Sequence, residues 1–202
     1  MSQVEPQSST FQSVADPAPL GLAAFAMTTV VLSCYNTGFL GPATEAVVLP
    51  LALFYGGLTQ LLAGMWEFRR RNTFGATAFS SFGAFWLAYY LLAKDVAPTL
   101  ATAADAHKAV GLFLLVWAIF TAYMTVASVR VSGAVLAVFT ALTLTFVLLS
   151  IGEFATSDTA TKIGGWLGLL TAAFAWYASF AGVVSSTFGR DVVPTMPGGP
   201  VR

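Results

Sequence analysis

Long apolar segments alternate with short polar segments along this chain. An α-helix needs about 20 predominantly apolar residues to cross the hydrocarbon layer of a bilayer, and six segments reach about that length. The pattern therefore predicts an all-α integral membrane protein with six transmembrane helices that form a bundle containing a pore. We expect these helices at about residues 20–39, 47–68, 77–93, 110–129, 133–151 and 163–188.

The polar segments suggest how the rest of the chain is organised. Residues 1–15 are rich in Ser, Thr and Gln, which is typical of a disordered N-terminal tail. Residues 16–191 then form the six-helix transmembrane domain. Asp16 can cap its first helix, and Pro17 suits the first helical position. Residues 192–202 contain three prolines and two glycines, and we expect a C-terminal tail there.

Composition supports the membrane assignment and excludes several functions. The chain is 57% hydrophobic and 9% charged, whereas a soluble domain carries about 25% charged residues. Its net charge is zero, so it has no basic field to attract nucleic acid. A single cysteine and a single histidine exclude an internal disulfide framework and a histidine-cluster metal site. We therefore expect no metal, no cofactor and no enzymatic activity.

The basic residues predict the orientation in the membrane. Six spans place both chain ends on one side, and that side collects six arginines against three lysines on the other side. The two sets are Arg69, Arg70, Arg71, Arg130, Arg190 and Arg202, and Lys94, Lys108 and Lys162. Because cytoplasmic loops carry more Lys and Arg, we expect cytoplasmic termini in a plasma or inner cell membrane. Glu67, beside the first three arginines, is expected to form a surface ion pair.

Uncharged polar side chains are the notable content of the spans. Apart from Glu67, no span carries Asp, Glu, Lys, Arg or His at depth, which argues against a proton-relay pump. Hydroxyls and amides could instead line a path for a small polar solute. Ser and Thr in membrane helices also bond to their own backbone or to a neighbouring helix, so each hydroxyl is open between these two roles. Gln60 and Asn36 are equally open, and Phe25 and Phe82 could be ordinary packing residues.

Several motifs together are more specific than any one of them. Residues 16–22 read D-P-A-P-L-G-L and closely resemble the N-P-A-P-L-G-L signature of the acetate uptake transporter family. That family includes the bacterial succinate–acetate permease and the yeast acetate and ammonium transport proteins. The resemblance continues through residues 54–57 with Gln60, Gly64 and Glu67, through residues 72–75 and 77–79, and through Phe85 and Trp86. It covers nearly the whole chain outside the two tails.

The resemblance implies a homohexameric ring with a pore through each six-helix subunit. It implies passage of acetate, and of succinate or similar small carboxylates, with or without a coupled proton. The family's hydrophobic constriction falls on Phe25, Phe82 and Leu142. The implied polar lining is Thr28, Thr29, Asn36, Tyr55, Gln60, Asn72, Thr73 and Thr77. The implied entrance motif is Asp16, Pro17, Pro19, Leu20 and Gly21.

Two departures from the family pattern affect these expectations. Asp16 stands where the signature has Asn, which adds a charge near the predicted inner mouth. Phe82 stands where the family has Tyr, which removes a hydroxyl from the constriction. Two other functions stay open on the residues alone: a channel for another small solute such as ammonia, and a membrane scaffold that transports nothing.

Overall fold

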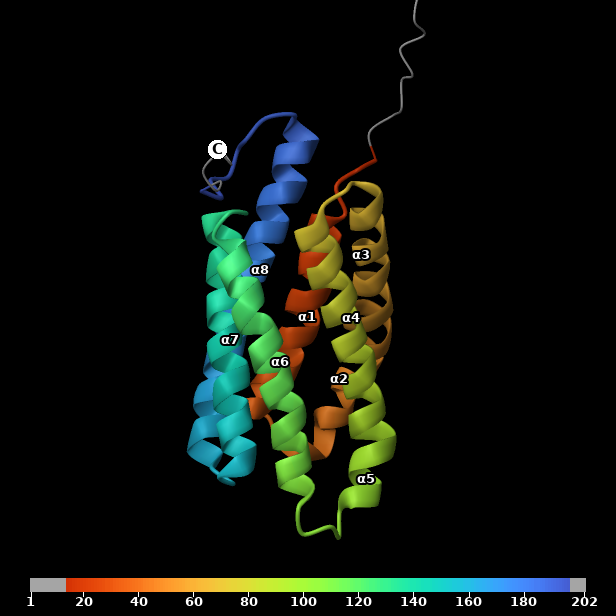
Figure 1. Cartoon of the computed structure of the whole chain (residues 1–202), viewed down its shortest axis with the longest axis vertical. Coiled ribbons are helices and arrows are strands. Elements are labelled where there is room, and N and C mark those ends of the chain that lie inside the picture. Colours follow the sequence, from red (N-terminus) through yellow and green to blue (C-terminus); the bar gives the residue numbers. More distant parts are fainter. Residues whose placement is uncertain (1–13, 197–202) are drawn as a thin grey trace, which may run out of the picture.

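The computed structural model describes residues 14–196, and within them the chain is a bundle of helices (Figure 1). Six helical segments are long and apolar enough to cross a membrane, so the expectation of six spans is confirmed. Four are single helices: α1 (Ala18–Asn36), α6 (Ala106–Ser128), α7 (Gly133–Phe154) and α8 (Asp158–Phe188). The second contains η1 (Pro42–Val47), α2 (Val48–Leu53), η2 (Phe54–Thr59) and α3 (Gln60–Arg69). The third contains α4 (Thr73–Leu91), η3 (Leu92–Val96) and α5 (Ala97–Leu100).

Helix ends differ from the predicted bounds where capping groups decide them. The first helix stops at Asn36 rather than near residue 39, because the chain turns through Gly38 at a φ of 76°. The sixth span starts at Asp158, five residues earlier than predicted. There the Ser157 hydroxyl accepts a hydrogen bond from the N–H of Ala160 and so caps the helix. Hydropathy alone does not report such caps.

The second span changes its winding halfway. η2 is a π-helical segment, in which each turn holds about one residue more than a turn of an α-helix. Gly56 and Gly57 lie inside it, and both are buried. A Cβ on Gly57 would come within 2.4 Å of the Ala52 carbonyl oxygen. Glycine at this position therefore lets the widened turn form, and such turns often occur at functional sites.

Helix α1 lies at the centre of the view in Figure 1, between α7 and α8 on one side and α3 and α4 on the other. Close contacts at glycines hold these neighbours together. A Cβ on Gly165 of α8 would come within 2.5 Å of the Thr37 amide nitrogen at the end of α1. A Cβ on Gly64 of α3 would come within 2.5 Å of the Ser80 amide nitrogen of α4. Small residues allow membrane helices to pack backbone against backbone in this way.

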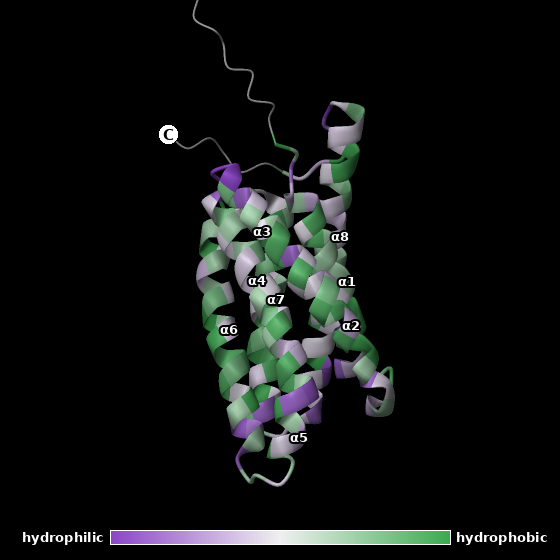
Figure 2. Cartoon of the chain, turned by 90° about the vertical axis from the view of Figure 1, so that its right-hand side faces the viewer, coloured by the Kyte–Doolittle hydropathy of each residue, from purple (hydrophilic) through white to green (hydrophobic). Residues whose placement is uncertain are grey.

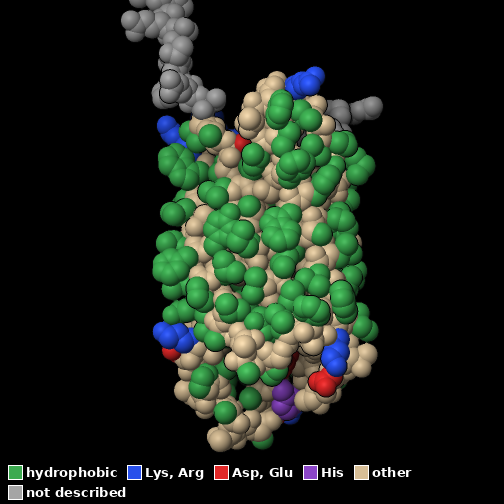
Figure 3. All heavy atoms as spheres, turned by 180° about the vertical axis from the view of Figure 1, so that it is seen from behind, with side chains coloured by type: hydrophobic (Ala, Val, Ile, Leu, Met, Phe, Trp, Pro, Cys, Tyr) green, Lys and Arg blue, Asp and Glu red, His purple; other side chains and the backbone are tan. Residues whose placement is uncertain are grey.

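The surface divides into an apolar band and two polar ends. Figure 2 shows hydrophilic residues gathered toward the top and bottom of the bundle, and Figure 3 shows hydrophobic side chains over the middle of one face. Both ends of the described chain lie at the top of Figure 1. The described arginines lie at this end, whereas Lys94, Lys108 and Lys162 lie at the other end.

The predicted tails fall mostly outside the described residues, because residues 1–13 and 197–202 are not among them. The described part of the C-terminal segment, 192–196, packs against the bundle. The Gly133 N–H donates to the Met196 carbonyl at 2.7 Å, and the Ala134 N–H donates to the Thr195 carbonyl at 3.2 Å. The Tyr177 hydroxyl donates to the Pro194 carbonyl at 2.5 Å. This segment therefore satisfies free N–H groups at the start of α7.

Candidate functional site

Three cavities follow one another along α1. We call them upper, middle and lower, in the orientation of Figure 1, and their volumes are about 220, 20 and 260 Å³. One buried water molecule needs about 10–15 Å³ of cavity volume. The middle cavity therefore has room for about one water, whereas the lower one has room for a solute of several heavy atoms.

We call the three cavities together the path. Residues that line two neighbouring cavities mark the points where the path is interrupted. Leu22 lines both the upper and the middle cavity. Phe25 and Leu142 line both the middle and the lower cavity. The wall residues of α1 recur every three or four positions, so one face of this helix follows the whole path. They are Ala18, Pro19, Leu22, Phe25, Thr29, Leu32, Ser33 and Asn36.

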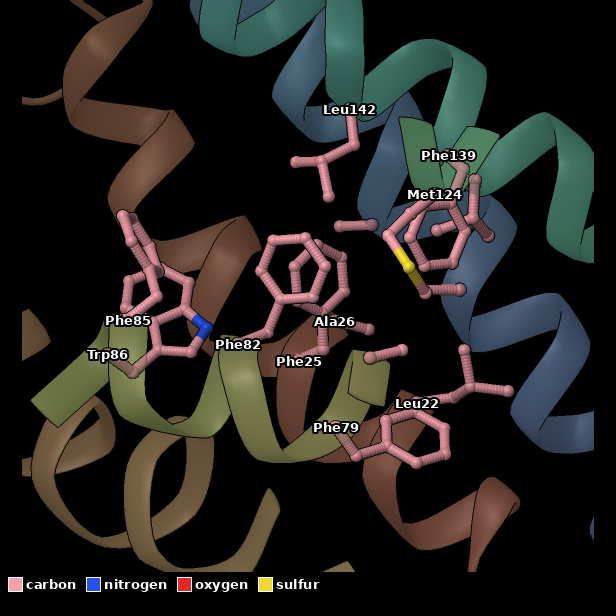
Figure 4. Packing of buried hydrophobic residues seen from close by; sticks show 14 of the residues in the cluster. Leu22, Phe25, Ala26, Phe79, Phe82, Phe85, Trp86, Met124, Phe139 and Leu142 are labelled. Atoms are coloured by element: carbon pink, nitrogen blue, oxygen red, sulfur yellow. The ribbon is translucent and has the colours of Figure 1, made fainter. Parts of the chain in front are cut away.

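Aromatic rings and leucines surround the small middle cavity (Figure 4). The rings of Phe25 and Phe82 have centroids 5.7 Å apart and are inclined at 60°. The ring of Phe82 also lies within 6.5 Å of four other aromatic rings. Phe25, Phe82 and Leu142 are all buried. The structure thus brings together the three residues that the family resemblance selected, although they come from three separate helices.

The lower cavity combines apolar walls with a few polar groups. Thr29, Ser33, Asn36 and Thr145 contribute side chains to its wall. At the end far from Phe25, the half-buried Glu45 and Glu153 line its mouth. The Tyr89 hydroxyl donates a hydrogen bond of 3.3 Å to Glu45 Oε1. Negative charge therefore lies at the mouth, whereas the wall near Phe25 is neutral.

Trp86 is a wall residue of the lower cavity that the predicted lining did not include. Its indole Nε1 is buried and has no hydrogen-bond partner among residues 14–196. The Phe85–Trp86 pair belongs to the sequence motifs above, so a signal existed. The motif alone, however, gave no reason to treat this tryptophan as a polar wall residue.

Gln60 stands alone as the polar group of the middle cavity wall. It begins α3 directly after η2, and its side chain is 1% exposed. In the described part of the chain, its Oε1 atom makes no hydrogen bond. An amide can turn over and present either its oxygen or its NH₂ group. Gln60 therefore has an unused hydrogen-bonding capacity beside the cavity that lies between Leu22 and Phe25.

Five residues of the predicted polar lining lie elsewhere. Within residues 14–196, the middle and lower cavities are not lined by Thr28, Tyr55, Asn72, Thr73 or Thr77. The Thr28 hydroxyl donates to the Ala24 carbonyl at 2.9 Å. It also packs on Gly56, where a Cβ would come within 2.6 Å of its Oγ1 atom. Thr28 is therefore a contact between helices.

Asn72 and Glu67 form a connected pair at the turn before α4. Asn72 caps α4, because its Oδ1 accepts from the Gly75 N–H at 3.1 Å. Its amide nitrogen donates to Glu67 Oε2 at 2.9 Å. The expected surface ion pair of Glu67 is wrong: its side chain is fully buried, and Arg70 pairs with Asp16 instead. Tertiary packing of α3 on α4 encloses the carboxylate beside Asn72.

The predicted entrance motif lies at the top of the path. Asp16 and Pro19 line the upper cavity, together with Val193 and Thr195 of the C-terminal segment. The helix begins at Ala18 and not at Pro17, and the Ala18 N–H donates to Asp16 Oδ1 at 3.0 Å.

The other three motif residues do not line this cavity. Pro17 is buried, and Leu20 is 45% exposed on the outer surface. A Cβ on Gly21 would come within 2.6 Å of the Phe79 ring, so this glycine allows α4 to approach α1. Over residues 14–196, no group of three or more His, Cys, Asp and Glu side chains could hold a metal ion.

Comparisons with known proteins agree with this geometry. The model of the GPR1/FUN34/yaaH family matches residues 2–197. The succinate-acetate/proton symporter SatP of Escherichia coli K12 is 39% identical over 182 residues, which cover 90% of this chain and 95% of SatP. Acetate permease A of Emericella nidulans is 42% identical over 194 residues and 89% of this chain. The match spans 65% of that fungal protein's length.

A solved structure shows the same fold. The bacterial acetate channel SatP superposes with a TM-score of 0.82 at 37% identity, covering 91% of this chain and 99% of that one. The six-helix architecture is therefore that of a known membrane protein. From the extent of these matches, the chain belongs to the GPR1/FUN34/yaaH family.

Proposed function

We propose that this protein is a permease or channel for acetate and related small carboxylates, succinate among them. The observation that carries the proposal is the row of cavities interrupted at Leu22 and again at Phe25 and Leu142. The middle cavity is walled by uncharged side chains, with Gln60 as its polar group. Such a path suits a short organic acid, which has an apolar end and a hydrogen-bonding end.

Relatives support the choice of substrate. One is named an acetate permease and another a succinate-acetate/proton symporter. The matched chain of the solved structure is described as an acetate channel. The fungal permease is longer than this chain, so its substrate is carried over here as part of the proposal and not as a finding.

Phe25, Phe82 and Leu142 act as the constriction in this proposal. Acetic acid titrates near a glutamic acid side chain, at about pH 4.3, so it reaches the protein as an anion at neutral pH. A carboxylate that enters an apolar constriction loses its water at a cost of several kcal/mol. The neutral acid avoids most of this cost. We therefore expect the acid to cross together with its proton.

The assembly and orientation complete the proposal. Large apolar side chains such as Trp166 and Phe180 of α8 are more than half exposed, as expected for a surface that faces lipid or other subunits. We expect a homohexameric ring with one path in each subunit. The arginines at the upper end favour cytoplasmic termini, which makes the upper cavity the inner mouth.

Uptake of radiolabelled acetate into proteoliposomes tests the function directly. Vesicles with the purified protein should accumulate acetate several times faster than empty vesicles. Propionate or succinate should compete, and ammonium should not. Equal uptake by empty vesicles would end the proposal in favour of a scaffold, and inhibition by ammonium alone would favour an ammonia channel.

A further inference from the structure

Two wall residues of the lower cavity carry a buried hydrogen-bond donor that has no partner among the described residues. The donors are Thr29 Oγ1 and Trp86 Nε1, and both atoms lack a hydrogen-bond acceptor within residues 14–196. The side chains are 6% and 2% exposed. Buried polar groups in folded proteins are nearly always bonded, so an unbonded pair in one cavity needs an explanation.

Thr29 differs from the other buried threonines of the bundle. The hydroxyls of Thr28, Thr121, Thr145 and Thr171 each donate to the carbonyl oxygen four residues earlier, at 2.7–2.9 Å. This bond is the usual way in which a threonine satisfies itself inside a helix. Thr29 makes no such bond, although it lies one residue after Thr28 on the same helix. Its hydroxyl therefore has an unused hydrogen-bonding capacity beside the lower cavity.

Trp86 is held firmly while its N–H group stays free. Its ring makes edge contacts with Phe85 and Tyr89, with centroids 5.1 and 5.7 Å away. Figure 4 shows the indole nitrogen turned toward the side on which Phe82 and Phe25 lie. An indole N–H can only donate, so no rotation converts it to an acceptor. The partner that it lacks must be an acceptor.

We propose that Thr29 and Trp86 form a subsite that binds the carboxyl group of the transported acid just below Phe25. This inference rests on the proposed function and extends it. Each donor bonds to one carboxyl oxygen, which can accept in both the ionised and the protonated form of the acid. The alkyl end then packs on the apolar walls that Leu142 and Phe146 provide.

Such a subsite explains the order of groups along the path. The carboxylates of Glu45 and Glu153 at the mouth disfavour an anion there, and the two donors deeper inside replace water around an acid that has entered. The acid therefore pauses where hydrogen bonds are available, immediately before the rings. Ordered waters could occupy the same 260 Å³, and the experiment must separate them from the acid.

Conservative variants test the subsite through the concentration dependence of acetate uptake. Thr29→Val removes the hydroxyl and keeps the shape, and Trp86→Phe removes the N–H and keeps an aromatic ring. Each should raise the KM for acetate about tenfold, because a hydrogen bond to a charged group is lost. Thr29→Ser restores the hydroxyl and should keep the wild-type KM. Thr121→Val is the matched control: this threonine is equally buried but bonded to Trp117, and it should leave the KM unchanged.

A binding measurement distinguishes failure of the subsite from failure of the function. Acetate should raise the melting temperature of the wild-type protein in detergent, and the shift should shrink in Thr29→Val and Trp86→Phe. If acetate shifts the wild type but not these variants while no uptake occurs, the subsite stands and the transport function falls. If uptake occurs and both variants keep the wild-type KM and thermal shift, only water occupies the donors and the inference is overturned.

Discussion

Buried amides and carboxylates in this bundle have different roles that depend on single contacts. Gln60 is a wall residue of the middle cavity and its Oε1 is unbonded, whereas Glu67, seven residues later on the same helix, bonds to Asn72 through Oε2 and leaves only Oε1 unbonded. Both side chains are at most 1% exposed. Burial alone therefore does not separate a residue of the path from a residue that joins two helices. The cavity beside Gln60 and the bond between Glu67 and Asn72 make the distinction.

Gln60→Leu should separate function from stability. Leucine has a similar volume, and the change removes a buried polar group that has no partner, so we expect the melting temperature to stay the same or rise slightly. Acetate uptake should fall at least tenfold, because the middle cavity loses its polar wall. Uptake in proteoliposomes and melting in detergent are the two measurements. Wild-type uptake by this variant would remove Gln60 from the path.

At the scale of helices, caps and close glycine contacts decide where each element ends and how near it lies to its neighbours. Asn72 caps α4, Ser132 caps α7 and Ser157 caps α8, each with a side-chain oxygen. Asn72 additionally donates to a buried carboxylate in α3, so it fixes one helix to another. Asn72 therefore stabilises both a helix end and a contact between two helices, whereas Ser132 and Ser157 cap their own helices.

Asn72→Ala should cost more stability than Ser157→Ala. Losing a cap costs about 1 kcal/mol, and leaving the Glu67 carboxylate without its donor adds about 1–3 kcal/mol. For a chain of this size, about 1 kcal/mol shifts the melting temperature by about 2–4 °C. We expect a shift of that size for Ser157→Ala and one two to three times larger for Asn72→Ala. Equal shifts in thermal denaturation would show that the bond to Glu67 contributes nothing.

Gly83→Ala should force α3 and α4 apart. A Cβ at Gly83 would come within 2.6 Å of the Leu61 amide nitrogen, and backbone cannot move aside as a side chain can. Overpacking of this kind costs about 1–3 kcal/mol. Gly41→Ala is the control, because a Cβ there meets nothing within 4 Å. The melting temperature should fall by several degrees for Gly83→Ala and stay constant for Gly41→Ala; the same value for both would contradict the close packing.

At the scale of the whole molecule, charge is placed at the two ends and kept out of the centre. Asp16 and Asp191 line the upper cavity, Glu45 and Glu153 line the lower one, and the middle cavity has no charged wall residue among those described. Because no described cation lines the middle cavity to stabilise a carboxylate, we expect the electrically neutral acid to be the form that crosses in the proposed function.

Acetate uptake should therefore follow the pH gradient and not the membrane potential. Moving one elementary charge through 100 mV is worth about 2.3 kcal/mol, so passage of the anion alone would respond strongly to an imposed potential. We expect less than a twofold change in initial rate at 100 mV, and a several-fold increase with a pH one unit lower outside than inside. Proteoliposomes with ionophore-imposed potentials provide the measurement. A strong response to potential would mean that the anion crosses.

The amino-acid sequence by itself determined the six spans, because about 20 consecutive apolar residues have few alternatives to crossing a bilayer. It also selected Phe25, Phe82 and Leu142, through motifs shared with a family. Only the tertiary structure decided which polar residues face the path. Thr28 and Thr29 are adjacent and chemically identical, yet one bonds to its own helix against Gly56, whereas the other lines the lower cavity and its hydroxyl has no partner among the described residues. Helical periodicity predicts which residues share a helix face. The atoms that these residues contact depend on which helix packs against that face, and a single sequence does not show this.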